Sequence, residues 1–264
     1  MARFPLTPAA PGPDLRPSLG CPLLPGVRLP GQLIGIGENY WPHPMGGSLV
    51  PLSSGPLSLG PAGNTAPDRR APGRIPLVFG KFSGSLAASN APIILTPAVT
   101  GPVVCEGELA VVMGSVLKDA RDAEEGLRAV AGVTVANDVS ARDLQAADIQ
   151  STRGKSLDTY CPLGPELVTL DEVPDLQALP LITRINGAVV QESCTSRMVF
   201  SVAELLIFCS RFMTLYPGDV ILTGTPWTAD ESVLKLHPGD TVSVEIKGVG
   251  TLTNPVVSNA ASPA

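Results

Sequence analysis

The distribution of proline constrains the fold of this chain more than any other feature of its sequence. The chain has 28 prolines in 264 residues, and eight of them lie within the first thirty residues. A second stretch dense in Pro, Gly and Ser covers residues 44–76. Because proline donates no backbone hydrogen bond, neither stretch can supply a central strand of a sheet. We therefore expect residues 1–32 to be an irregular segment and residues 44–76 to be a long loop.

Short runs rich in Val, Ile and Leu lie between and after these stretches and are typical of strands. Turn signals precede some of them, such as Pro217-Gly-Asp219 and Pro238-Gly-Asp240, and Asn186-Gly187 can close a tight hairpin. The predicted strands are Gln32–Gly37, Leu77–Lys81, Gly107–Met113, Gly132–Asn137, Leu181–Ile185, Asp219–Leu222 and Thr241–Lys247.

Two helices are predicted. Ala120–Ala131 contains good helix formers, and Gly132 could stop that helix. Ser201-Val-Ala-Glu204 is a capping box ahead of an apolar run, and Pro217 prevents the helix from continuing. The fold class predicted from these elements is α+β and rich in strands.

Composition narrows the range of partners. Charged residues make up 16% of the chain, the net charge is −6, and Lys and Arg do not cluster, so we expect no nucleic-acid or membrane partner. The longest apolar runs, such as Leu109–Met113, fall far short of the roughly 20 residues of a membrane-spanning helix. The five cysteines form no CxxC pair and the N-terminus has no apolar signal region, which favours a reducing, cytoplasmic location.

Two glutamates begin one of the predicted strands. Glu106 and Glu108 are two residues apart, so both side chains would lie on one face, with Gly107 leaving room on the other. Asp138 follows another predicted strand. Three carboxylates without a nearby Cys or His would suit a hard cation such as Mg²⁺, Mn²⁺ or Ca²⁺. From the spacing alone, however, a solvated strand edge is the more common explanation.

A wider set of motifs resembles the fumarylacetoacetate hydrolase family from about Leu33 to Val257. The matching blocks are Gly37-Glu-Asn-Tyr-Trp-Pro-His43, Phe79-Gly-Lys81, Glu106-Gly-Glu-Leu-Ala-Val-Val-Met-Gly114, Asn137-Asp-Val-Ser-Ala-Arg-Asp-Leu-Gln145, Lys155-Ser-Leu-Asp158 and Pro217-Gly-Asp-Val-Ile-Leu-Thr-Gly-Thr-Pro226. The resemblance implies a mixed β-sandwich roll, one catalytic domain over residues 33–257, a flexible tail over 258–264 and a homodimer. It also implies that Glu106, Glu108 and Asp138 bind a divalent metal, most commonly Mg²⁺.

The same resemblance implies roles for other residues. Lys155 would stabilise an oxyanion or enolate of the substrate, and a surface lysine is the alternative. Arg142 and Gln145 would reach substrate carboxylate or keto oxygens, although either could instead partner Asp143. Thr225 would present a hydroxyl to a substrate carboxylate, unless its segment is an ordinary turn. Lys81 matches a lysine of the substrate pocket by position, or is structural.

His43 matches the catalytic histidine of the family. In the family a glutamate three residues later helps it to activate water or to move a proton, but here that position is Gly46. A carboxylate partner raises the basicity of an imidazole, so its loss should weaken water activation. Asp68 or Glu38 could substitute.

Three reactions of small 2-oxo or β-diketo acids share an enolate and fit this resemblance. Hydrolysis of a C–C bond is placed first because the family resemblance most often implies it. Isomerisation or tautomerisation and decarboxylation are the alternatives, since neither needs an activated water. A metal-binding protein without turnover is the other class that we consider.

Overall fold

The computed structural model describes residues 3–5, 30–41 and 75–259. The predicted N-terminal segment, long loop and tail lie mostly outside these residues. The division of the chain into those parts and a catalytic domain therefore stays a prediction.

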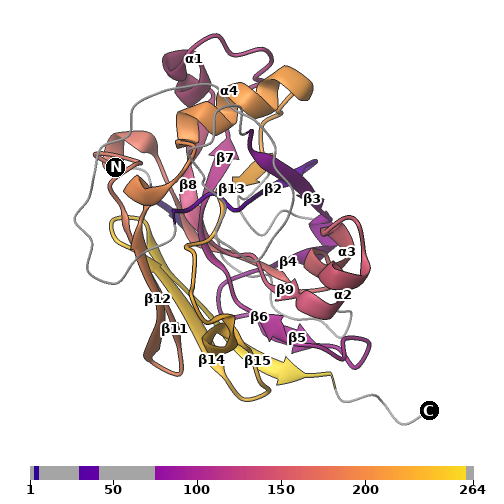
Figure 1. The fold of residues 1–264 in the computed structure, drawn as a ribbon. Coiled ribbons are helices and arrows are strands. Elements are labelled where there is room, and N and C mark those ends of the chain that lie inside the picture. The colour runs from indigo at the N-terminus through magenta and orange to yellow at the C-terminus, as the bar shows by residue number, and fades with distance from the viewer. Residues whose placement is uncertain (1–2, 6–29, 42–74, 260–264) are drawn as a thin grey trace.

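Two sheets form most of the structure (Figure 1). The larger sheet has eight strands. Its order is β1 (Arg3–Pro5), β10 (Cys161–Val168), β8 (Val130–Asn137), β7 (Gly107–Met113), β13 (Val220–Leu222), β2 (Leu33–Gly37) and β3 (Leu77–Lys81), with β4 (Leu86–Ala87) paired to β10 outside this row. The second sheet has the order β12 (Ala188–Cys194), β11 (Pro180–Ile185), β14 (Thr241–Ile246), β15 (Gly250–Ser258) and β5 (Ile93–Leu95). A small pair joins β6 (Val103–Val104) to β9 (Ser140–Ala141).

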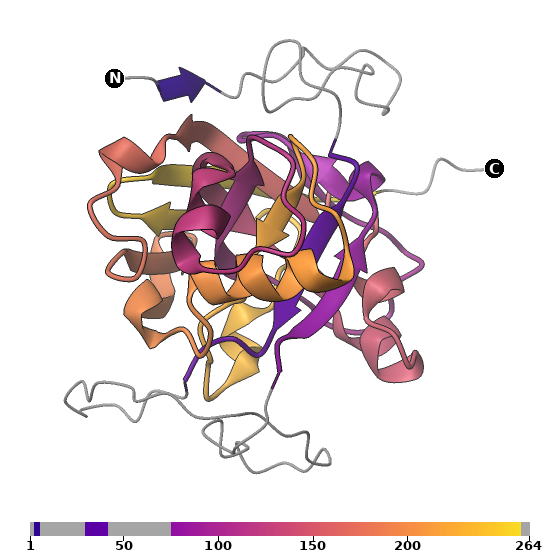
Figure 2. The same cartoon turned by 90° about the horizontal axis from the view of Figure 1, so that it is seen from above.

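Helices lie at two places around the sheets. The α-helices are α1 (Ala123–Arg128), α2 (Arg142–Ala147), α3 (Thr152–Lys155) and α4 (Val202–Phe212). Helix α4 lies across the strands of the larger sheet together with α1, while α2 and α3 lie beside β3 and β9 (Figures 1 and 2). Short 3-10 helices are η1 (Ser83–Ser85), η2 (Leu170–Glu172), η3 (Thr195–Arg197) and η4 (Glu231–Leu234).

The larger sheet is covered by an apolar core on each face, and alternate side chains of β7 enter the two cores. Its seven residues are all buried. Because side chains alternate along a strand, Leu109 and Val111 join the core that contains α4 and the second sheet. Ala110 and Val112 face the opposite core, which β10 and β4 complete. Glu108 shares this second face, so its carboxylate is buried at the end of an apolar layer.

The strand-rich α+β prediction is confirmed, and all seven predicted strands are present within one or two residues of their ends. Asn186 and Gly187 both have positive φ angles and close the β11–β12 hairpin, as expected. The capping box at Ser201 is also confirmed, because its hydroxyl and the Glu204 side chain each bond the other residue's backbone N–H.

One predicted helix is too long. Helix α1 ends at Arg128, and Gly132 does not stop it but lies inside β8. A side chain at Gly132 would overlap the backbone carbonyl of Val168 on β10, so the glycine allows the strands to pair there. Helices α2 and α3 were not predicted, and neither were strands β1, β4, β5, β6, β9, β10, β12 and β15. Strand β1 lies within the segment that was expected to be irregular.

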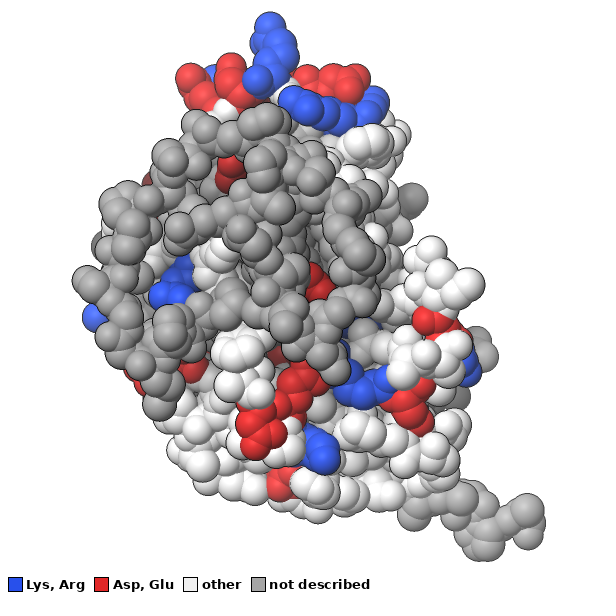
Figure 3. Space-filling model, in the orientation of Figure 1, with Lys and Arg blue, Asp and Glu red and all other residues white. Residues whose placement is uncertain are grey.

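On the face drawn in Figure 3, acidic and basic side chains are interspersed and form no large patch of one sign among the described residues. No helix in the described part of the chain has both the length and the apolar character needed to cross a bilayer. Cys105, Cys161, Cys194 and Cys209 are all free thiols.

Candidate active site

Two antiparallel strands bring three carboxylates together. Strand β7 begins where β8 ends, and Gly107 pairs with Asn137 in their ladder. The junction is fixed by the Asp138 N–H, which donates to the Glu106 carbonyl over 2.8 Å, and by the Glu106 N–H, which donates to the Asn137 side chain over 2.9 Å. Oxygens of Glu106, Glu108 and Asp138 all lie within 4.8 Å of one another, and all three residues are buried.

Gly107 allows the second sheet to approach this junction. A Cβ at Gly107 would overlap the hydroxyl of Thr183 on β11 and come within 2.9 Å of a methyl group of Val244 on β14. The room expected opposite the two glutamates is therefore filled by Thr183. The Thr183 hydroxyl and the Asn137 amide nitrogen are buried and find no hydrogen-bond partner among the described residues.

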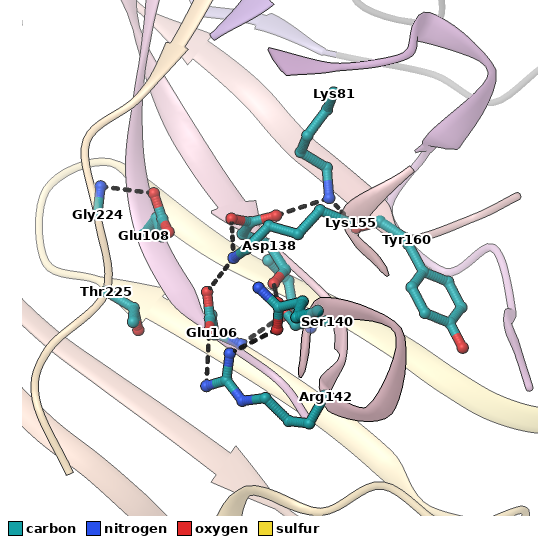
Figure 4. A network of polar contacts seen from close by, with 12 residues as sticks. Lys81, Glu106, Glu108, Asp138, Ser140, Arg142, Lys155, Tyr160, Gly224 and Thr225 are labelled. Carbon is teal, nitrogen blue, oxygen red and sulfur yellow. Dashed lines mark hydrogen bonds and ion pairs between the residues drawn. The ribbon is translucent and has the colours of Figure 1, made fainter. Parts of the chain in front are cut away.

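Two lysines hold the carboxylates from the other side (Figure 4). The Lys155 ammonium at the end of α3 lies 2.6 Å from a Glu106 oxygen and 2.5 Å from an Asp138 oxygen. The other Asp138 oxygen accepts from Lys81 at 2.6 Å, and Lys81 also donates to the Tyr160 carbonyl at 2.9 Å. The Lys81 side chain is fully buried behind Asp138. This geometry favours a structural role for Lys81 over direct substrate contact.

Arg142 at the start of α2 extends the charge network beyond Glu106, which it contacts in Figure 4. Its guanidinium donates to Glu106 at 2.9 Å, to the Gln145 side chain at 2.9 Å and to Glu231 at 3.0 Å. Glu231, on η4, is 59% exposed, whereas Glu106 is almost fully buried. Arg142 and Gln145 thus lie together at the site: Gln145 accepts from Arg142, and Arg142 also pairs with two acidic side chains. Among the described residues neither forms a hydrogen bond or ion pair with Asp143. Sequence reasoning had not identified Glu231.

The carboxylates differ in their electrostatic surroundings. Burial would raise the pKa of Asp138, but Lys155 and Lys81 hold it below its usual value. Burial, reinforced by Asp138, raises the pKa of Glu108 well above its usual value, and Lys155 only partly opposes this shift. Among the described residues, Glu108 has one hydrogen-bond donor, the N–H of Gly224 at 2.6 Å, and no ion pair. Glu108 is therefore the carboxylate whose charge is least compensated.

This donor set fits a hard divalent cation. All three side chains offer carboxylate oxygens, which Mg²⁺, Mn²⁺ and Ca²⁺ prefer. A cation facing Glu108 would supply the positive charge that it lacks, as Lys155 does for Glu106 and Asp138. The residues that could hold a metal are therefore Glu106, Glu108 and Asp138.

The segment from Thr223 to Thr228, here called the Thr225 loop, borders the carboxylates on the side away from Lys81 (Figure 4). Gly224 has a φ of +97°, and a Cβ there would come within 2.8 Å of Asn39. Asn39 in turn donates to the carbonyls of Thr223 and Phe200. The glycine thus permits the close approach in which its N–H reaches Glu108, and Thr225 lies half-buried beside it.

Two expected features are not covered. His43 and Gly46 lie outside the described residues, so the role of His43 as a base stays a prediction.

Sequence reasoning also missed Gln191 on β12, which is buried and contacts the Thr225 loop. The available signal was weak, because a polar residue on a strand beside a predicted hairpin is usually exposed.

The family described as fumarylacetoacetate (FAA) hydrolase C-terminal matches residues 33–257. The mitochondrial oxaloacetate tautomerase Fahd2a of Rattus norvegicus is 44% identical over 186 residues, which cover 69% of this chain and 59% of the rat protein. The chain thus spans about three-fifths of that longer relative.

Solved structures agree with the family match. A 5-carboxymethyl-2-hydroxymuconate delta-isomerase from Mycobacterium smegmatis is 38% identical, with a TM-score of 0.71 over 88% of this chain and 80% of that one. A fumarylacetoacetate hydrolase from Exiguobacterium antarcticum is 33% identical, with a TM-score of 0.74 over 88% of this chain and 77% of that one. This likeness extends to the whole mixed-sheet architecture described above. The chain belongs to the fumarylacetoacetate hydrolase family.

Proposed function

We propose that the chain is a divalent-metal-dependent enzyme that promotes enolisation of a small 2-oxo acid, with keto–enol tautomerisation or isomerisation as its net reaction. The observation that carries this proposal is the buried group of three carboxylates with the Lys155 ammonium between two of them. The preference for tautomerisation over hydrolysis comes from the names of the rat and M. smegmatis relatives and from Gly46.

The residues divide the chemistry between them. A divalent cation held by Glu106, Glu108 and Asp138 would supply Lewis-acid polarisation of the 2-oxo group. Lys155 keeps its proton, because Asp138 and Glu106 raise its pKa despite its burial. A permanent positive charge in a buried site favours negative charge that develops on a substrate oxygen. Lys155 is therefore the residue proposed to stabilise the enolate.

Binding of the substrate carboxylate is assigned to Arg142 and the Thr225 loop. Arg142 has donors directed at Glu106, Gln145 and Glu231. Of these contacts, the one with exposed Glu231 costs the least free energy to break, since water can solvate that carboxylate. The N–H groups of Arg142 that are freed in this way can form a paired hydrogen bond with the carboxylate of the substrate.

Hydrolysis of a C–C bond is the second candidate. The E. antarcticum relative is a hydrolase by name, and hydrolysis needs a base to activate water. His43 is the proposed base in either reaction, but with Gly46 in place of glutamate it suits the transfer of a proton better than the activation of water.

Turnover assays would test the proposal. The Mg²⁺-loaded protein should accelerate the loss of enol absorbance from freshly dissolved enol oxaloacetate without a change in mass. Cleavage of an acylpyruvate into two acids would instead favour hydrolysis, and CO₂ release would favour decarboxylation. The absence of any reaction with 2-oxo or β-diketo acids would favour a metal-binding protein without turnover.

Metal analysis provides an independent test of the site. We expect about one divalent ion per chain, lost when Glu106→Ala is combined with Glu108→Ala. The matched control combines Glu124→Ala with Glu125→Ala, two adjacent carboxylates on α1 away from the site. Unchanged metal content in the first double variant would contradict the site assignment.

Three further expectations accompany this proposal. A homodimer is proposed from the family resemblance, and sedimentation equilibrium should then give the mass of two chains. The metal is proposed to be Mg²⁺. A cytoplasmic location stays a prediction, and the name of the rat relative places that protein in mitochondria.

A further inference from the structure

Gln191 connects the strand of the metal-binding glutamates to the Thr225 loop. It lies on β12 of the second sheet, opposite Thr183 in the ladder, and is 4% exposed. Its side-chain oxygen accepts from the Gly107 N–H at 3.3 Å. Its two N–H groups serve three acceptors, namely the Pro226 carbonyl at 2.9 Å and the hydroxyls of Thr225 and Thr228 at 3.1 and 3.3 Å, so one N–H group is shared between two of them. One carboxamide therefore spans the gap between two parts of the site.

The contacts of Gln191 fix the orientation of its amide. A backbone N–H can only donate, so the atom facing Gly107 must be the oxygen. A backbone carbonyl can only accept, so the atom facing Pro226 must be the nitrogen. If the amide were reversed, its nitrogen would face the Gly107 N–H, placing two donors together, and its oxygen would face the Pro226 carbonyl, placing two acceptors together. Gln191 therefore presents N–H groups to the Thr225 loop.

This orientation determines what the Thr225 hydroxyl can do. The amide nitrogen has no lone pair to offer, so the Thr225 oxygen accepts in this contact and its own hydrogen points elsewhere. The hydroxyl is half-buried and belongs to the loop that meets Glu108 through Gly224. A hydroxyl whose oxygen is already occupied by a donor is prepared to donate to an anionic ligand.

We propose that Gln191 is a positioning residue, which fixes the Thr225 hydroxyl as a hydrogen-bond donor to a substrate carboxylate and holds the Thr225 loop in register with Glu106 and Glu108. The inference rests on the proposed function in one respect, namely that a carboxylate ligand occupies the site. Gln191 acts only through Thr225 and the loop, and it does not touch the reacting atoms.

A double-mutant cycle on ligand binding tests this inference. Calorimetry would measure the affinity of oxalate, a small carboxylate probe, for the Mg²⁺-loaded protein. Gln191→Leu and Thr225→Val should each weaken binding about tenfold, the effect of one lost hydrogen bond to a charged group. The double variant should be no weaker than either single variant, because both changes remove the same donor.

Two further variants separate positioning from folding. Gln191→Met keeps the approximate size and adds no charge but lacks the N–H donors, so it should lose oxalate affinity as Gln191→Leu does while the protein still folds and binds Mg²⁺. Gln177→Leu is the matched control, since Gln177 also links backbone groups through its amide, but the groups it links are the Thr195 carbonyl on η3 and the Val202 N–H at the start of α4. Its oxalate affinity should stay within about twofold of the wild type.

Several results would overturn the inference. They are additive losses in the cycle, unchanged oxalate affinity in both Gln191 variants, no oxalate binding by the wild-type protein, and failure of both Gln191 variants to fold. Because the readout is binding, the cycle can succeed even if no tautomerase activity is found. Failure of the proposed function and failure of this inference are therefore distinguishable.

Discussion

Lys155 is the residue around which the charges of the site are arranged. Lysine and carboxylate alternate from Lys81 through Asp138 and Lys155 to Glu106, and Arg142 continues this alternation toward the surface. Each buried carboxylate in this series has a cation at hydrogen-bonding distance, which offsets the large cost of removing a charge from water. Glu108 lies outside the series. Within this group of carboxylates, only Glu108 therefore lacks a cationic partner among the described residues, and a bound metal would supply one.

The glycine between the two glutamates should not tolerate a methyl group. Gly107→Ala places a Cβ against Thr183 and Val244, so β7 must shift at the point where it presents both proposed metal ligands. We expect a loss of about 1–3 kcal/mol in the free energy of unfolding, measured by urea denaturation, and weaker Mg²⁺ binding.

Gly80→Ala is the matched control for that change. Gly80 also lies in a strand, but a Cβ there meets nothing within 4 Å. It should leave the unfolding free energy within about 0.5 kcal/mol of the wild type and Mg²⁺ affinity unchanged. Equal effects of the two substitutions would show that loss of glycine flexibility, and not the contact with Thr183, is the cause.

At the scale of elements, the sequence predicts strands well where apolar residues run on without interruption and a turn signal precedes them. It fails for β10, because Pro162 and Pro165 interrupt the pattern and β10 pairs with β8 only through a register shift between Gly164 and Val168. It also fails for α2 and α3, which have six and four residues. Helices this short depend on tertiary contacts more than on local preference.

Helix α2 is tied to the preceding segment by one carboxylate. Asp143 accepts hydrogen bonds from the N–H groups of Thr100, Gly101 and Leu144 at 2.8 to 3.0 Å. Partial burial would raise the pKa of Asp143, but these N–H groups outweigh that effect and hold the pKa below its usual value. The carboxylate therefore stabilises the fold above the pKa that it has in the unfolded chain, and this contribution is lost as the pH falls through the lower, folded value.

We expect Asp143→Asn to lower the free energy of unfolding by about 1 kcal/mol at pH 7, and the difference from the wild type to shrink as the pH falls below the unfolded pKa of about 3.9. Urea denaturation at each pH would measure it. Asp119→Asn, at an exposed partner of Lys118, is the control and should change stability little at any pH. A difference that grew on acidification would contradict the assigned direction.

At the scale of the whole molecule, the site forms where the larger sheet meets the second sheet and the α2–α3 segment. The sequence identified the three carboxylates, Lys155 and Arg142 through linear motifs. It could not identify Gln191 or Glu231, because each reaches the site from a segment distant in sequence. Their contribution depends on how β12 and η4 pack against the strands. Residues of this kind follow from the tertiary fold and not from any local pattern.

If the three carboxylates bind a metal as proposed, this arrangement exchanges stability of the metal-free protein for affinity for the metal, and Glu108 should reveal that exchange. Its buried carboxylate lacks an ion pair among the described residues and lies near two other carboxylates, so without metal it opposes folding. Glu108→Gln removes the charge and keeps an oxygen for the Gly224 N–H. In EDTA this variant should therefore unfold at a higher temperature than the wild type.

Added Mg²⁺ should reverse that order. Ligand binding to the folded state stabilises the wild type by about 2.7 kcal/mol at a free concentration one hundred times the dissociation constant. Glu108→Gln should gain much less, because one of its three charged ligands is gone, and the two unfolding temperatures should cross during a Mg²⁺ titration. Glu192→Gln, at an exposed glutamate on β12, should follow the wild type throughout. The proposal would be contradicted if Glu108→Gln unfolded at a lower temperature than the wild type in EDTA, or if Mg²⁺ raised the unfolding temperature of both proteins equally. Either result would show that the metal does not compensate the buried charge of Glu108.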